Sequence, residues 1–118
     1  MTKHGKNVIG QSVHVVVDRP LGSRHPKHKD LVYEVNYGYV PGILGGDGEE
    51  QDVYILGVDE PLSAFDGVVI AVLDRADDDE EKWVAAPEGV DFSDEEILAR
   101  THFVEKYFKT DLRRGGNL

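Results

Sequence analysis

The strongest structural signal in the chain lies at residues 67–74, which run Gly67-Val68-Val69-Ile70-Ala71-Val72-Leu73-Asp74. β-Branched residues are common in strands, and a short continuous apolar run fits a strand that is buried on both faces. We therefore predict a central strand over residues 67–74. Four further runs, bounded by turn residues, predict strands at residues 13–17, 31–35, 52–56 and 82–86. Five short strands indicate a small β-barrel or a β-sandwich.

The last quarter of the chain changes to a helical pattern. Ser93 is a favourable N-cap residue, and Glu96 three positions later completes a capping box. From Ile97 onward, apolar side chains recur at helical spacing. We expect one helix over about residues 94–108 that packs on the strands, followed by a frayed tail from Arg113.

Length and composition limit the class of protein. A chain of 118 residues fits a single domain over residues 1–118. It contains no cysteine, which excludes disulfides, thiolate nucleophiles and Cys-ligated zinc. Its apolar runs fall far short of the roughly 20 residues that span a bilayer, and its first residues lack the apolar stretch of a secretory signal. We expect a cytoplasmic protein that does not enter a membrane.

The charges are acidic in sum and segregated along the chain. Thirteen Lys and Arg residues stand against 23 Asp and Glu residues, a net charge of −10, which argues against nucleic acid and anionic lipid as partners. Residues 19–29 are basic, whereas residues 47–52 and 77–81 are acidic. This segregation predicts a cation-binding site beside an anion-binding site. The alternative is that each run is a solvated loop.

The acidic run at residues 47–52 suits a hard divalent cation. Asp47 follows a glycine-rich loop and Asp52 opens a predicted strand, so their carboxylates can approach one point from two directions. Oxygen ligands of this kind favour Mg²⁺, and the run lacks the 12-residue ligand series of an EF-hand. Spacing alone leaves both the metal site and the solvated loop open.

Several ordered motifs carry a family resemblance. Residues 33–42 run Tyr-Glu-Val-Asn-Tyr-Gly-Tyr-Val-Pro-Gly and lead into Asp47-Gly48-Glu49-Glu50-Gln51-Asp52. This pattern resembles the soluble inorganic pyrophosphatases of the first family. Similar matches are found at residues 18–27, 80–87 and 103–107, in the same order as in that family.

The resemblance implies a fold and a reaction. The expected fold is mainly β, a five-stranded OB-like closed barrel with a C-terminal helix packed on it. The expected reaction is hydrolysis of pyrophosphate to two orthophosphates with Mg²⁺, for which Mn²⁺ or Co²⁺ are alternatives. Because the substrate is an anion, metals and basic side chains must screen its charge before an attacking water can reach it. The resemblance also implies a homo-oligomer.

The resemblance also assigns roles to individual residues. Its metal ligands are Asp47, Asp52, Glu80 and an upstream aspartate that is either Asp77 or Asp78. Glu49 stands where the family has its general base, and Asp52 would bridge two ions. The substrate-contacting positions are Lys27, Tyr37, Lys82 and Tyr107.

Two departures weaken the phosphate half of this expected site. The family's hairpin with a phosphate-binding arginine is missing between Lys27 and Tyr33, and we hypothesise that Arg24, His25 or His28 replaces that charge. The lysine that follows the helical tyrosine is also absent, because Phe108 occupies its place. A non-catalytic or altered-substrate descendant, which binds metal and a small phosphate compound in the same cleft, is therefore the alternative to a pyrophosphatase.

Overall fold

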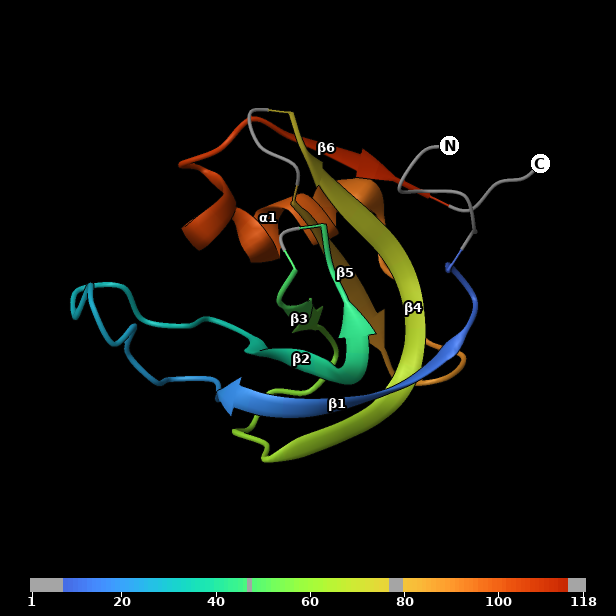
Figure 1. Ribbon diagram of the computed structural model, residues 1–118, viewed down its shortest axis with the longest axis horizontal. Coiled ribbons are helices and arrows are strands. Elements are labelled where there is room, and N and C mark those ends of the chain that lie inside the picture. The colour runs from blue at the N-terminus through green and yellow to red at the C-terminus, as the bar shows by residue number, and fades with distance from the viewer. Residues whose placement is uncertain (1–7, 47, 77–79, 115–118) are drawn as a thin grey trace.

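The computed structural model describes residues 8–46, 48–76 and 80–114 (Figure 1). Its elements are, in chain order, β1 (Ser12–Arg19), β2 (Asn36–Leu44), β3 (Glu50–Ile55), β4 (Ala64–Arg75), β5 (Glu81–Ala86), α1 (Asp94–Glu105) and β6 (Thr110–Arg113). The strands β1 to β5 form a ring in the order β1-β2-β3-β5-β4, which closes where β1 pairs with β4. All these pairings are antiparallel except that of β3 with β5. The mainly β fold with a five-stranded barrel and a C-terminal helix is therefore confirmed.

The barrel is built around β4, which contains the predicted strand at residues 67–74. Its first half pairs with β1, and its second half pairs with β5 on one edge and β6 on the other. The side chains from Val69 to Leu73 are between 0% and 9% exposed. Val72 packs into one core cluster, whereas Ile70 and Leu73 pack into a second one. The prediction of a strand buried on both faces is confirmed.

One predicted strand, at residues 31–35, is wrong. Tyr33 and Val35 are buried while Glu34 is exposed, an alternation typical of a strand, but this segment pairs only locally with the chain just before it. The Tyr33 amide donates to the Ser23 carbonyl at 2.8 Å, and Arg24 and Val32 form an isolated bridge. The alternation of apolar and polar residues at 31–35 therefore matches their burial, although the segment does not pair as a strand of the barrel.

The strand in this region is β2, which begins at Asn36 and continues through Pro41 and Gly42, two residue types that are uncommon inside strands. β2 lies between β1 and β3. At Gly38 a Cβ atom would come within 2.0 Å of the Val16 carbonyl oxygen, so only glycine permits this close pairing. Residues 20–35, which connect β1 to β2, extend to one side of the barrel (Figure 1).

The helix α1 begins where its N-cap residue predicts, but it ends earlier. The Ser93 side chain accepts a hydrogen bond from the Glu96 amide at 3.1 Å. The reciprocal half of the capping box is not formed, because the Glu96 carboxylate pairs with Arg100 at 3.0 Å. The last helical residue is Glu105, whereas we predicted about residue 108. The Phe108 amide donates to the Glu105 carbonyl, three residues back, and this tight turn redirects the chain.

The segment after the helix is a strand rather than a loose tail. β6 pairs with the end of β4, with Leu112 opposite Leu73. The prediction of a frayed tail from Arg113 is wrong for the two described residues, since Arg113 pairs with Asp74 and Arg114 pairs with Asp91. Within the described ranges, no helix has the length and apolarity that crossing a membrane requires.

Candidate active site

A cavity of about 800 Å³ lies between the β1–β2 connection and the chain at the C-terminal end of α1. Three of the residues expected to contact substrate line it, and each comes from a different part of the fold: Tyr37 from β2, Lys82 from β5 and Tyr107 from the turn after α1. Tyr107 is 67% exposed, so it stands at the rim. The fold brings these three side chains together from positions up to 70 residues apart in the sequence.

Lys82 joins the cavity to two of the predicted metal ligands. Its ammonium group lies 2.5 Å from an Asp52 oxygen and 2.9 Å from a Glu80 oxygen. Asp52 belongs to β3, and Glu80 immediately precedes β5, the parallel neighbour of β3. Both carboxylates therefore face the same point, which the Lys82 ammonium group occupies.

These two carboxylates have the right chemistry for Mg²⁺, because both present oxygen atoms. Within the described residues, no group of three or more His, Asp or Glu side chains is close enough to hold a metal ion. The predicted ligands Asp47, Asp77 and Asp78 lie outside the described residues. Of the predicted metal ligands, only Asp52 and Glu80 lie within the described residues.

Tyr37 lies close to one of these carboxylates, Asp52. Burial raises the pKa of Tyr37 well above its ordinary value, and the nearby negative charge of Asp52 raises that pKa further. The Lys82 ammonium lies 5.9 Å from the centre of the Tyr37 ring. The phenol is therefore held neutral, as a hydrogen-bond donor beside an acidic group.

A further carboxylate, Asp18 of β1, belongs to this electrostatic environment. Burial raises the pKa of Asp18, Arg19 opposes that rise, and the charge of Asp52 adds to it. Asp18 and Asp52 therefore repel each other across the barrel end. A cation placed between acids of this kind is stabilised.

The predicted general base, Glu49, is exposed in the turn between β2 and β3. Its carbonyl accepts a hydrogen bond from the Gly45 amide at 2.7 Å, which closes the turn. The adjacent Glu50 carboxylate accepts a hydrogen bond from the Gly42 amide at 3.0 Å. The backbone of this loop is thus tied at two points, and the catalytic role of Glu49 stays a prediction.

Two of the expected substrate residues do not line the cavity. Arg24 is exposed and donates to the Lys29 carbonyl at 2.7 Å. Lys27 is also exposed, and its amide donates to the His25 ring at 3.0 Å. The two histidines that the sequence analysis considered as replacements, His25 and His28, do line the cavity, with ring centres 4.9 Å apart.

The sequence analysis missed a buried ionic cluster beside the cavity. Arg75, at the end of β4, directs its Nε and Nη2 atoms to the two Glu105 oxygens at 3.2 and 2.7 Å, and its Nη1 atom to Glu80 at 3.2 Å. The hydroxyl groups of Tyr54 and Thr110 donate to Glu105 at 2.6 and 2.7 Å. Every Glu105 oxygen is therefore bonded to two donors.

Both members of this ion pair stay charged. Burial alone raises the pKa of Glu105, yet the hydrogen bonds from Arg75, Tyr54 and Thr110 outweigh it and leave that pKa below its usual value. Burial alone lowers the pKa of Arg75, but its bond to Glu105 more than compensates. The fold thus keeps a guanidinium ion at the cavity wall.

The sequence did contain a signal for this cluster. Glu105 follows Ile97 and Thr101 at intervals of four, and all three are buried on one face of α1. Arg75 follows Leu73 at the two-residue period of a strand. The helical pattern was followed through apolar side chains alone, so a carboxylate at a buried position was overlooked.

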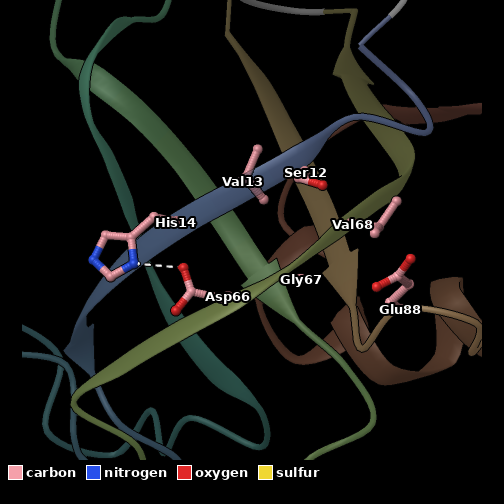
Figure 2. Close-up of a pocket in the computed structure, with 7 residues that line it drawn as sticks. All are labelled: Ser12, Val13, His14, Asp66, Gly67, Val68 and Glu88. Carbon is pink, nitrogen blue, oxygen red and sulfur yellow. Dashed lines mark hydrogen bonds and ion pairs between the residues drawn. The ribbon is translucent and has the colours of Figure 1, made fainter.

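A second hollow, of about 360 Å³, lies across β1 and β4 (Figure 2). It contains an exposed pair in which the His14 ring and the Asp66 carboxylate are 2.8 Å apart. None of the described residues that were predicted for the site lines this hollow. The larger cavity is therefore the candidate active site.

Comparison with known proteins supports the resemblance at two levels. No family model matches the chain. An inorganic pyrophosphatase of Aeropyrum pernix is 38% identical over 77 residues, which are 62% of this chain and 40% of that protein. The match therefore spans about two fifths of the length of that relative.

Solved structures extend the likeness to nearly the whole chain. An inorganic pyrophosphatase from Ehrlichia chaffeensis superposes with a TM-score of 0.69 at 18% identity, over 97% of this chain and 91% of the other. One from Neisseria gonorrhoeae gives a TM-score of 0.66 at 23% identity, over 97% and 87%. At these identities the structures show a shared fold. The resemblance to inorganic pyrophosphatases, first drawn from the motifs, is confirmed.

Proposed function

We propose that this chain hydrolyses inorganic pyrophosphate to two orthophosphates with the help of Mg²⁺. The observation that supports the proposal is that Tyr37, Lys82 and Tyr107 line one cavity. Lys82 also forms ion pairs with the Asp52 and Glu80 carboxylates. A cavity with a cationic wall and adjacent carboxylates can take an anion and its metal ion together.

The side chains would divide the work of binding and proton transfer. Lys82 and Tyr37 would donate hydrogen bonds to the phosphate groups, and Tyr107 would close the rim. Glu49 is proposed to accept the proton of the attacking water as the phosphorus–oxygen bond forms, and the bridging oxygen would leave with the second phosphate. Asp47, Asp52, Glu80 and either Asp77 or Asp78 would hold the metal ion. When bound, Mg²⁺ supplies charge neutralisation and lowers the pKa of water.

The direct test is release of orthophosphate from pyrophosphate by the purified chain. We expect activity that requires Mg²⁺, that EDTA abolishes, and that Asp52→Asn lowers by at least about 10²-fold, since metal and charge stabilisation dominate phosphoryl transfer. Asp66→Asn is the matched control, because Asp66 is an exposed aspartate outside the cavity. Absence of turnover with Mg²⁺, Mn²⁺ and Co²⁺ would contradict the proposal.

A binding protein without turnover is the second candidate. It is favoured by Arg24 and Lys27, which do not line the cavity and so leave fewer cations for a diphosphate. Calorimetry would then detect binding of pyrophosphate or metal while phosphate release stays at background. A panel of nucleotides and other phosphoanhydrides would identify an altered substrate. The cytoplasmic location and the homo-oligomer remain predictions.

A further inference from the structure

We propose that Arg75 is a substrate-binding residue of the cavity, where its guanidinium group holds a phosphate, and that Glu105 is the positioning residue that orients it. This assignment rests on the proposed function. It replaces the hypothesis that Arg24 supplies the cation.

Arg75 lies on the wall of the candidate active site. Among the arginines that the structure describes, Arg75 alone lines the cavity. Lys82 lines the same cavity, and the two side chains are equally accessible, each 7% exposed. Both also contact one carboxylate, Glu80. The two cations therefore lie side by side on one wall.

The Arg75 guanidinium group also has N–H donors beyond those bonded to Glu105 and Glu80. A guanidinium group has five N–H donors in one plane. Its bonds to Glu105 and Glu80 use three of them, counted over the described residues. The Phe108 ring covers one face, with its centre 3.6 Å from the Arg75 Cζ atom. One N–H group of Nη1 and one of Nη2 remain, and both lie in the guanidinium plane, where a phosphate oxygen can accept their hydrogen bonds.

The Arg75 side chain is also held in one orientation before a ligand binds. Glu105 grips it at two atoms, and Glu105 itself is fixed by the hydroxyl groups of Tyr54 and Thr110. Tyr54 is fully buried in the barrel core. A side chain that is already ordered loses little conformational entropy on binding, so its hydrogen bonds contribute more fully to affinity.

The test measures affinity for methylenediphosphonate, a diphosphate that is not hydrolysed, by calorimetry in Mg²⁺. Arg75→Lys keeps the charge but loses the planar fork, and we expect binding at least about tenfold weaker. Arg113→Lys is the matched control. Arg113 also pairs with two carboxylates, but it lies outside the cavity, and its replacement should leave affinity within about twofold.

A second measurement uses the unaltered protein and so does not depend on the folding of a variant. Nitrogen-15 spectra of the arginine side chains should show the Arg75 Nε–H signal moving as methylenediphosphonate is added, while the Arg113 signal stays in place. Equal affinity of a folded Arg75→Lys, or an Arg75 signal that moves no more than that of Arg113, would overturn the assignment.

The positioning role of Glu105 has its own readout. Glu105→Gln keeps the shape but removes the charge that fixes Arg75, so we expect the KM for pyrophosphate to rise severalfold with kcat within about twofold. A variant that was only partly folded would lower kcat and leave KM unchanged. That second pattern would remove Glu105 from the assignment.

The outcomes separate this assignment from the proposed function. If the unaltered chain neither binds methylenediphosphonate nor releases phosphate, both fail. If it does both, and Arg75→Lys binds equally well, only the role of Arg75 fails.

Discussion

Two arginine–carboxylate clusters lie on opposite faces of the same strand. The inner cluster consists of Arg75, Glu105, Tyr54 and Thr110, and the outer cluster consists of Arg113, Asp74 and Glu81. They face opposite ways because Asp74 and Arg75 are neighbours in β4, where successive side chains alternate.

The clusters have similar distances but different surroundings. Arg75 and Glu105 are 7% and 5% exposed, whereas Arg113 and Asp74 are 30% and 26% exposed. Breaking a buried pair strands a charge away from water, while breaking an accessible pair returns both charges to solvent. We therefore expect burial, rather than distance, to decide how much each ion pair contributes to the free energy of unfolding.

The largest effect is expected from Glu105→Ala. This change leaves the Arg75 charge buried without its main partner and should lower the free energy of unfolding by about 3–5 kcal/mol. Urea denaturation followed by circular dichroism measures it. A loss below about 1 kcal/mol would mean that Arg75 reaches water easily and that the inner cluster resembles the outer one.

A smaller loss is expected from Tyr54→Phe. The hydroxyl removed donates to a buried carboxylate at 2.6 Å, so unfolding should become easier by about 1.5–3 kcal/mol. The ring stays in place, which limits the change to the hydrogen bond. Denaturation midpoints compared at constant slope would measure it, and an unchanged midpoint would show that Arg75 and Thr110 alone satisfy Glu105.

Acid provides a test of the same carboxylate without removing atoms. Because the folded pKa of Glu105 lies below its usual value of about 4.5, its contribution to stability is fully present above that value and is lost as the pH falls through the folded pKa. We expect Glu105→Gln to flatten the acid limb of a stability–pH curve. A parallel acid limb in the variant would contradict the low pKa.

The smallest effect is expected from Arg113→Ala in the outer cluster. Its partners Asp74 and Glu81 remain partly hydrated, so the loss should be about 0–1 kcal/mol and should shrink further in high salt. Thermal denaturation at low and high ionic strength measures both. A loss as large as that of Glu105→Ala would end the distinction between the two clusters.

The candidate site was only partly predictable. Tyr37, Lys82, Tyr107 and Asp52 were named from motifs, because these stretches keep a recognisable order of residues. Only the folded chain brings Tyr37, Lys82 and Tyr107 to one cavity, and the parallel pairing of β3 with β5 places Asp52 beside Lys82. Arg24 was chosen for its closeness in sequence, yet its guanidinium group bonds to its own loop.

The surroundings of Phe108 also became clear only in the folded chain. The sequence analysis noted that Phe108 stands where the family resemblance implies a lysine, and it counted a lost charge. In the structure that ring lies against Arg75, which comes from β4. A charge missing from one segment can be supplied by a segment remote in sequence, and no local pattern reports that exchange.

The apolar strand at residues 67–74, the helix N-cap at Ser93 and the order of the acidic and tyrosine motifs could all be predicted from the amino-acid sequence. These features depend on side-chain periodicity and on contacts between near neighbours. Three other features became visible only in the folded chain: β1 meets β4 to close the barrel, residues 110–113 add a strand, and Glu105 holds Arg75 at the cavity wall. Such pairings depend on burial and on distances between segments far apart in the chain, which become defined only when the core is packed.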